Sequence, residues 1–224
     1  MDADKPSLVG IYGGTFDPIH FGHLRVAEEL IDSINLQHII FVPSGEPRLR
    51  NTPIGTRHQR TEMIRLAIQD NHQFSIDERE INRPGISTTV ESLREFQQES
   101  NGNRILCFIL GIDAFIKINQ WFQWREIFNL CHLLVVARPG YGAIDDNQTV
   151  PQEVAQELRM RHVLSVNCLS QQAVGLIYIA HTSLLEISAS RIRHLVNTGK
   201  SVRYLLPDKV SDYITTNHIY TEKA

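Results

Sequence analysis

The chain has 224 residues, of which 42% are hydrophobic and 21% are charged, and its formal net charge is −3. This composition is ordinary for a globular protein with a sizeable core, and the small negative charge argues against a broad nucleic-acid-binding surface. Three widely spaced cysteines, the lack of a signal-peptide pattern and the lack of a bilayer-length apolar run lead us to expect a cytoplasmic protein with no membrane association.

A glycine-rich turn separates the first expected strand from the first expected helix. The apolar run 8–12 predicts a buried parallel strand, and the spacing of apolar residues from Leu24 to Ile34 predicts a helix. Between them lies the segment Gly13-Gly14-Thr15-Phe16-Asp17-Pro18-Ile19-His20-Phe21-Gly22-His23. Adjacent glycines let the backbone approach a ligand, and a helix start offers unpaired N–H groups and partial positive charge. The turn is therefore a predicted phosphate-binding site.

His20 and His23 lie three positions apart, so both side chains point to one side if they stand at the helix start. They could donate hydrogen bonds to phosphate, ligate zinc, or satisfy backbone groups in a purely structural role. Zinc would need further ligands from elsewhere in the chain. The glycine pair and Asp17 in the same turn favour phosphate binding, although neither the dinucleotide fingerprint nor the P-loop spacing is present.

Further strands and helices alternate along the rest of the chain. The expected strands are 38–42, 74–76, 104–110, 132–137 and 177–180, and the expected helices begin near residues 56, 88, 152, 188 and 207. Residues 44–55 and 141–151 are expected to be loops. This alternation predicts an α/β fold with a doubly wound parallel sheet. We expect a single domain over 1–224, in which about 183–224 form a mostly helical C-terminal subregion.

Several polar or aromatic residues stand where these elements begin or end. Thr88-x-x-Glu91 is typical of a capping box, and Ser188 is the expected N-cap of its helix. Asp113 follows a buried strand, where a carboxylate can bind sugar hydroxyls or cap the next helix. Trp121 is either a stacking residue or a core anchor.

The segment from Gly13 to His23 resembles the signature of nucleotidyltransferases that transfer a nucleoside monophosphate from a nucleoside triphosphate. The whole chain is similar to the bacterial nicotinate-nucleotide adenylyltransferase family, and four later segments extend the resemblance: Val42-Pro43 with the loop to Arg50, Ser87-Thr88-Thr89, Gly111-x-Asp113 with Trp121, and Ile187 to Arg193. Two departures stand out. Leu49 and Arg48 replace a histidine and a proline of the family's loop, and Thr88 replaces the tyrosine of its Ser-Tyr-Thr element.

The resemblance implies a Rossmann-like nucleotidyltransferase fold and a reaction between ATP and nicotinate mononucleotide that yields deamido-NAD and pyrophosphate. It implies Mg²⁺ bound mainly through the ATP phosphates, with no metal site made by the protein. The catalytic residues that it implies are His20, His23 and Arg193. The implied ATP-binding residues are Gly13, Gly14, Thr15, Phe16, Asp17, Arg50, Arg138, Ile187, Ser188 and Ser190, and the implied mononucleotide-binding residues are Ser87, Thr88, Thr89, Gly111, Asp113 and Trp121.

Other functions stay open from the sequence. The chain could prefer nicotinamide mononucleotide, or it could be a nucleotide sensor without catalytic activity. Phosphopantetheine adenylyltransferases usually carry threonine where His20 stands, and cytidylyltransferases lack the region around Trp121, so both are disfavoured. No pattern in the sequence indicates an oligomeric state.

Overall fold

The structure is a computed structural model that describes residues 6–45, 52–100, 102–136, 150–183 and 185–221. Its strands are β1 (Ser7–Gly14), β2 (His38–Pro43), β3 (Phe74–Ile76), β4 (Arg104–Gly111), β5 (His132–Val136) and β6 (Ile177–Ala180). Its α-helices are α1 (Phe21–Ile34), α2 (Arg57–Ile68), α3 (Arg79–Asn82), α4 (Thr89–Ser100), α5 (Ile112–Phe115), α6 (Gln152–Arg161), α7 (Ala189–Asn197) and α8 (Asp208–Thr216). Short 3-10 helices span Ile118–Gln120, Trp124–Asn129 and Val166–Ser170.

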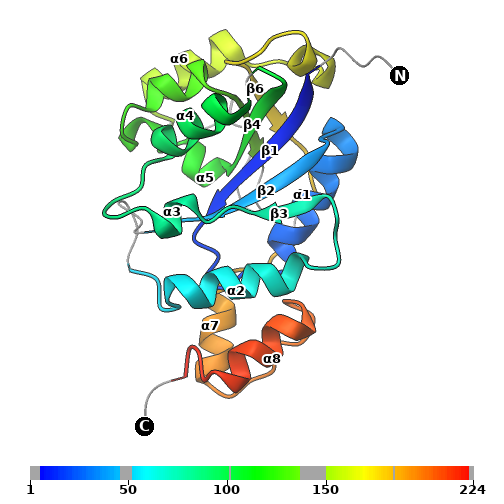
Figure 1. Cartoon of the computed structure of the whole chain (residues 1–224), viewed down its shortest axis with the longest axis vertical. Helices are drawn as coiled ribbons and strands as arrows, with labels where there is room; N and C mark the ends of the chain where they lie inside the picture. The colour runs from blue at the N-terminus through cyan, green and yellow to red at the C-terminus, as the bar shows by residue number, and fades with distance from the viewer. Residues whose placement is uncertain (1–5, 46–51, 101, 137–149, 184, 222–224) are drawn as a thin grey trace.

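The described strands form one parallel sheet in the order β3-β2-β1-β4-β5-β6 (Figure 1). The first strand is central because the chain winds outward from it in one direction and then crosses to β4 and winds the other way. In open α/β sheets, ligands bind outside the carboxyl ends of the strands at such a reversal. The doubly wound parallel sheet expected from the sequence is therefore confirmed.

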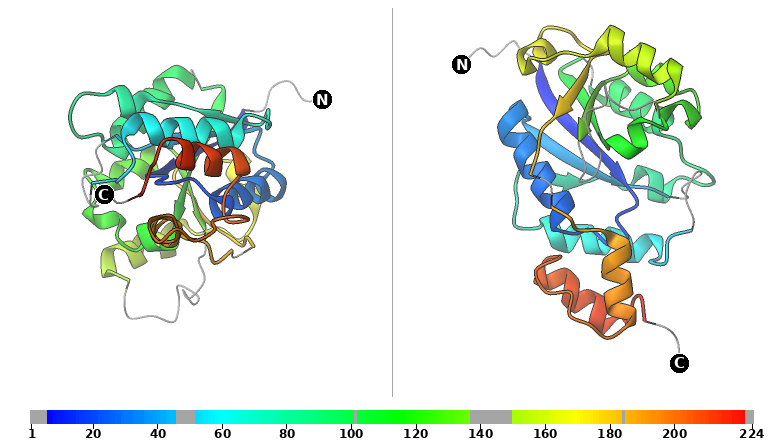
Figure 2. Two further views of the ribbon diagram at one scale, coloured as in Figure 1. Left: turned by 90° about the horizontal axis from the view of Figure 1, so that it is seen from below. Right: turned by 180° about the vertical axis from the view of Figure 1, so that it is seen from behind.

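Helices cover both faces of the sheet (Figures 1 and 2). Alternation along β4 explains how: Ile105, Cys107 and Ile109 join an apolar cluster with α1, α2, α7 and α8. Leu106, Phe108 and Leu110 face the opposite cluster, which includes α4, α5 and α6. Strands buried on both faces appear as the nearly continuous apolar runs that the sequence shows.

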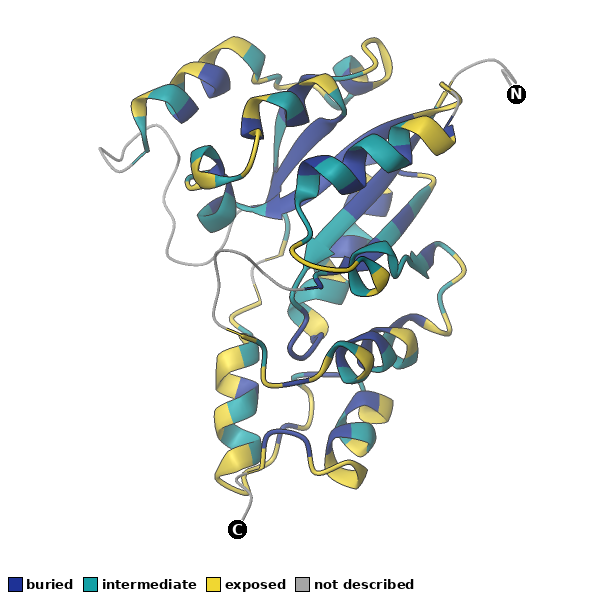
Figure 3. Cartoon of the chain, turned by 60° about the vertical axis from the view of Figure 1, so that its left-hand side comes forward, coloured by how far each residue is buried: buried dark blue, intermediate teal, exposed yellow. Residues whose placement is uncertain are grey.

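The C-terminal helices α7 and α8 lie below the sheet, beside α2, and are mostly half-exposed or exposed (Figure 3). Their buried residues Ile192, Val210 and Ile214 belong to the same apolar cluster as α1 and α2. This shared core supports the single-domain interpretation of 1–224, which stays a prediction. In the part of the chain that the structure describes, no helix is both long and apolar enough to cross a membrane.

Among the described elements, the expected helices did not include α3, α5 or the 3-10 helices. A four-residue helix and 3-10 turns have too few positions to show an apolar period, which explains their absence from the expectations. The first strand also runs further than the apolar run 8–12, because Gly13 and Gly14 still pair with Val42 and Pro43 of β2. Three expectations lie wholly or partly outside the described residues: the loop over 44–55 at 46–51, the loop over 141–151 at 141–149, and the end of the strand at Ala137.

Candidate active site

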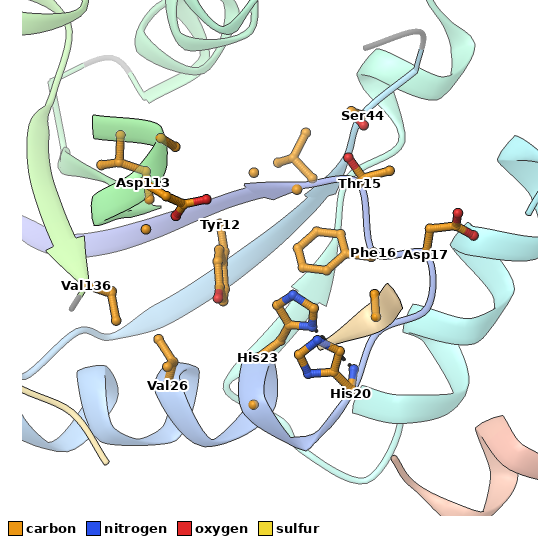
Figure 4. A pocket seen from close by; sticks show the side chains of 18 of the residues that line it. Tyr12, Thr15, Phe16, Asp17, His20, His23, Val26, Ser44, Asp113 and Val136 are labelled. Atoms are coloured by element: carbon orange, nitrogen blue, oxygen red, sulfur yellow. Dashed lines mark hydrogen bonds between the residues drawn. The ribbon is translucent and has the colours of Figure 1, made fainter. Parts of the chain in front are cut away.

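A cleft with a volume of about 890 Å³ opens at the carboxyl ends of the strands. This volume lies near the upper limit of ordinary ligand pockets, which measure about 300–1,000 Å³, so the cleft has room for more than one small substrate. Its walls include the end of β1, the start of α1 and the helix α5, which carries Asp113 (Figure 4). The segments 87–89 and 185–193 complete the lining. All of the catalytic and binding residues that the resemblance implied, as far as they lie in the described part of the chain, line this cleft.

His20 and His23 stand together at the start of α1 (Figure 4). Their rings are stacked, with centroids 3.8 Å apart and an angle of 26° between the planes. The backbone N–H of His20 donates to Nδ1 of His23 over 3.3 Å. Because Nδ1 of a neutral His23 then accepts, its proton resides on Nε2, and that nitrogen is a donor. The common side predicted for the two histidines is therefore present.

Neighbouring rings occupy the space that a side chain would fill at two glycines of this turn. A Cβ on Gly14 would lie 2.8 Å from the ring of Phe16, and a Cβ on Gly22 would lie 3.0 Å from the ring of His20. Phe16 has a φ of 47°, an unusual value for a residue with a side chain, and its ring contacts that of His23 at a centroid distance of 5.1 Å. The small residues thus allow the aromatic packing that fixes His20 and His23, a reason beyond the close ligand approach that the sequence suggested.

Asp17 is buried, and its carboxylate binds groups of the protein. Oδ2 accepts a hydrogen bond from the N–H of Ile54 at 2.9 Å. Oδ1 accepts from the N–H of Gly55 at 3.0 Å and from the hydroxyl of Tyr220 at 2.7 Å. The side chain therefore ties the motif to the segment before α2 and to the C-terminal subregion, which the expectation of ATP binding did not include.

Arg60 of α2 is a buried cation that the sequence analysis missed, since only 1% of its surface is exposed. Its guanidinium donates to the carbonyl oxygens of Thr15 and Ser44, both at 2.8 Å, and more weakly to those of Gly45 and Gly55. Burial lowers the pKa of Arg60, and the charge of Asp17 partly opposes that effect. Arg60 thereby joins the loops that follow β1 and β2.

Arg193 reaches the same loop from α7. Its Nη1 donates to the backbone carbonyl of Asp17 at 2.7 Å and lies 3.8 Å from the Oδ2 atom of that residue. Its Nη2 donates to Oγ of Ser190 at 3.3 Å. Ser188 is the N-cap of α7, as predicted, and its Oγ accepts from the N–H of Arg191. The carbonyl of Ile187 would lie 3.6 Å from a Cβ on Gly22, so the two predicted motifs meet.

Another wall of the cleft is formed by the segment Ser87-Thr88-Thr89. The capping box expected there is only partly formed: the Glu91 carboxylate accepts from the N–H of Thr88 at 3.1 Å, and the Thr88 hydroxyl donates to the same carboxylate at 2.7 Å. These hydrogen bonds, led by that of the hydroxyl, lower the pKa of Glu91. Thr88 N–H is thus occupied, which leaves Ser87 and Thr89 as candidate backbone donors to a ligand.

Glu80 of α3 lines the cleft together with this segment, and the sequence analysis did not predict it as a site residue. Its carboxyl group accepts a hydrogen bond from the Ser92 hydroxyl at 2.8 Å. Burial is the main effect on its titration and raises the pKa of Glu80. The helix α3 is too short to give a sequence signal, so nothing in the pattern marked this residue.

Gly111, Asp113 and Trp121 form the wall after β4. Gly111 is the N-cap of α5, and Asp113 lies in the first turn, so the possibility that Asp113 caps this helix is wrong. Trp121 is half-buried, and its ring meets Phe108 edge-on at a centroid distance of 6.1 Å. Trp124 is instead buried and packs on Phe128. Of the two tryptophans, Trp121 is the one that lines the cleft.

Comparisons with known proteins agree with this site. A family model described as cytidylyltransferase-like matches residues 11–195. Proteins named as probable nicotinate-nucleotide adenylyltransferases are 40% identical over 214 residues in Yersinia pestis (strain Pestoides F), covering 96% of each chain, and 41% identical over 212 residues in Dechloromonas aromatica, covering 95% of this chain and 97% of the relative. The chain belongs to the nicotinate-nucleotide adenylyltransferase family.

A solved structure of the Plasmodium falciparum nicotinic acid mononucleotide adenylyltransferase complexed with NaAD has a TM-score of 0.70. It is 17% identical, and the match covers 96% of this chain and 97% of that one, so it supports the Rossmann-like fold. Two ATP-binding residues that the family resemblance implied, Arg50 and Arg138, lie outside the described residues, as does Leu49. Among the residues that the structure describes, no third His, Cys, Asp or Glu joins His20 and His23 as a possible metal ligand.

Proposed function

We propose that this protein transfers the adenylyl group of ATP to nicotinate mononucleotide, which yields deamido-NAD and pyrophosphate. The observation that carries the proposal is that the stacked pair His20–His23 and Arg193, which donates to the Asp17 carbonyl of the same motif, line one cleft large enough for two substrates. Relatives of the same length carry the name of this activity. A helix start and three possible cations at one point are suited to a polyphosphate.

In the proposed reaction, an oxygen of the mononucleotide phosphate attacks the α-phosphorus of ATP. The new O–P bond forms as the bond between the α-phosphorus and the bridging oxygen breaks, and pyrophosphate leaves with that oxygen. The attacking oxygen is already ionised at neutral pH, so neither a general base nor a protein nucleophile is needed. What the protein must supply is in-line positioning and stabilisation of the negative charge that develops on the leaving group.

The described residues can supply both. His20, His23 and Arg193 lie on the phosphate side, where donors fixed before the reaction stabilise developing charge without reorganisation. The loop Gly13 to Asp17 and the start of α7, from Ile187 to Ser190, hold the ATP phosphates and ribose. Asp113 and Gly111 contact the ribose of the mononucleotide, whose hydroxyls can donate to the carboxylate, and Trp121 stacks on its pyridine ring.

Magnesium fits this arrangement as an ion held by the ATP phosphates and water. The carboxylate of Asp17, in the same motif as the histidines, is occupied by three donors from the protein. Mg²⁺ commonly keeps several waters and binds through substrate phosphates rather than in a protein cage. When bound, it would neutralise charge on the departing pyrophosphate.

A preference for nicotinate is part of the proposal. The two possible mononucleotides differ only in the carboxylate or carboxamide on the ring, so selectivity must arise at the end of the cleft near Ser87 and Thr89. Backbone N–H groups there favour a carboxylate, which only accepts hydrogen bonds, over an amide that also presents an NH₂. The absence of an aromatic residue at position 88 loosens the stack on the ring without removing these donors.

The test is pyrophosphate release from ATP with each mononucleotide, measured as kcat/KM. Turnover with nicotinate mononucleotide and a several-fold lower kcat/KM with the amide would support the proposal. Equal values would refute the nicotinate preference. ATP binding without pyrophosphate release from either substrate would instead identify a nucleotide sensor.

A further inference from the structure

The Asp17 carboxylate is the point at which three segments distant in the sequence meet. It is 5% exposed and accepts hydrogen bonds from Ile54, Gly55 and Tyr220. A Cβ on Gly55 would lie 2.8 Å from its Oδ1 and 3.3 Å from the Tyr220 hydroxyl oxygen. The segment before α2 can therefore approach both groups only because glycine stands there.

Tyr220 follows α8 and is itself buried, with 6% of its surface exposed. Burial is the main cause that raises the pKa of its phenol, and the charge of Asp17 adds to the effect. The hydroxyl consequently stays protonated and donates to Asp17 over 2.7 Å. A short hydrogen bond from a neutral donor to a buried carboxylate restrains the position of both partners.

Asp17 in turn fixes Arg193. Nη1 of the arginine donates to the Asp17 carbonyl at 2.7 Å and lies 3.8 Å from its carboxylate. Only Ser190 provides a further hydrogen bond to the guanidinium in the described contacts. The orientation of the planar guanidinium group of Arg193 thus depends chiefly on the position of Asp17.

We propose that Tyr220 and Asp17 are positioning residues for adenylyl transfer, which act by aiming Arg193 at the departing phosphates. This inference rests on the proposed function. In the described part of the chain, the hydroxyl of Tyr220 binds Asp17 and approaches Met63, neither of which belongs to the proposed mononucleotide site, so its effect should fall on the transfer step and not on recognition of the mononucleotide. Small misplacements of a catalytic group can reduce the rate by as much as about a hundredfold.

The test is a cycle of four proteins: wild type, Tyr220→Phe, Arg193→Lys and the double variant. Tyr220→Phe keeps the ring that packs in the core and removes only the hydroxyl. We expect it to reduce kcat about tenfold, with the KM of nicotinate mononucleotide unchanged within about twofold. In the Arg193→Lys background, Tyr220→Phe should reduce kcat no more than about twofold, because the planar guanidinium group that Asp17 positions is already absent.

Tyr213→Phe is the matched control, since it removes a hydroxyl from α8 of the same subregion and Tyr213 makes no described contact with Asp17. It should leave kcat unchanged. Equal losses from Tyr220→Phe in both backgrounds, or an unchanged kcat, would overturn the proposal. If Tyr220→Phe fails to fold, Asp17→Asn replaces it, because the amide keeps the shape of the carboxylate and the same non-additivity with Arg193→Lys is expected.

The two proposals fail separately. A wild-type protein that releases no pyrophosphate refutes the proposed function alone. The cycle is then measured as the increase in Tm caused by MgATP, which Tyr220→Phe should reduce only when Arg193 is present. Equal reductions in both backgrounds would again overturn the positioning role.

Discussion

The two ends of the cleft are built in different ways. At the phosphate end, Asp17 and Arg60 are buried and hydrogen-bonded to backbone groups of several loops, so the surrounding structure leaves little freedom. At the ring end, Ser87, Asp113 and Trp121 are half-buried side chains on short helices and turns. Under the proposed function, the part of the cleft that would bind the phosphates is held by buried contacts, whereas the part that would select the mononucleotide consists of half-buried side chains that can change without disturbing the core.

Substitution of the histidines should give the largest effect. We expect His20→Ala and His23→Ala each to reduce kcat by about a hundredfold to a thousandfold, since each removes a preorganised donor to developing charge. The KM of ATP should change little. Steady-state pyrophosphate release checks this, with the exposed His72→Ala as control. Turnover like that of the wild type in either variant would remove the assignment. If the wild type lost its activity to a chelator that strips zinc and regained it only with added zinc, the zinc interpretation would replace it.

Arg193→Lys tests whether the phosphate end depends on geometry as well as charge. A lysine retains the charge but cannot bind Asp17 and Ser190 with two nitrogens of one plane. We expect kcat to fall at least about tenfold, because the guanidinium is no longer held in place. Arg203→Lys, at an exposed position, is the control. A kcat equal to that of the wild type would mean that a point charge suffices.

Trp121→Ala tests the ring end alone. Loss of stacking should raise the KM of nicotinate mononucleotide about tenfold, since one base stacked on an aromatic side chain contributes roughly 1–3 kcal/mol. The KM of ATP should stay within about twofold. The measurement is kcat/KM for both substrates, together with Tm. An unchanged KM for the mononucleotide with a lowered Tm would assign Trp121 to the core.

The smallest expected effect concerns the pH dependence of stability and involves His132, which does not line the cleft. It lies fully buried at the amino end of β5, where Nε2 contacts the carbonyl oxygens of Leu169 and Gln172 and Nδ1 accepts from the N–H of Leu176. Burial lowers the pKa of His132 below its usual value near 6.5. The unfolded chain therefore binds a proton more readily, and stability should decrease as pH falls below about 6.5.

Urea unfolding of the wild type and of His132→Gln between pH 7.5 and 5.5 measures this dependence. The variant should show a shallower decrease in the free energy of unfolding, while its kcat at pH 7.5 stays unchanged. If the free energy of unfolding fell equally with pH in the wild type and in His132→Gln, protonation of His132 would not control acid stability.

The difference between the two ends also explains how far the sequence could predict the molecule. Apolar runs and helical spacing predicted the strands and most helices, because the sheet is buried on both faces. The phosphate motif was visible because its residues are contiguous. Arg60 and Tyr220 were not, since the sequence around them resembles an ordinary polar helix and an ordinary C-terminal segment, and their importance comes from contacts made only in the folded chain.

Family resemblance filled part of that gap but not all of it. It implied that the segment 187–193 and the motif at residues 13–23 bind the same ligand, and the two segments do lie together, although no local sequence pattern connects them. It could not show that Glu91 occupies the N–H of Thr88, because that contact depends on the local geometry at the start of α4. The roles of the individual site residues stay predictions, and the variants above test them.

The contact between Asp17 and Tyr220 joins positions 203 residues apart. Closing so long a segment costs chain entropy that earlier contacts must outweigh, so contacts of this kind form late in folding. During refolding, the sheet and its helices should assemble before the phosphate loop is held in its final position. Enzymatic activity should accordingly return after the fluorescence of the buried Trp124 has reached its native value.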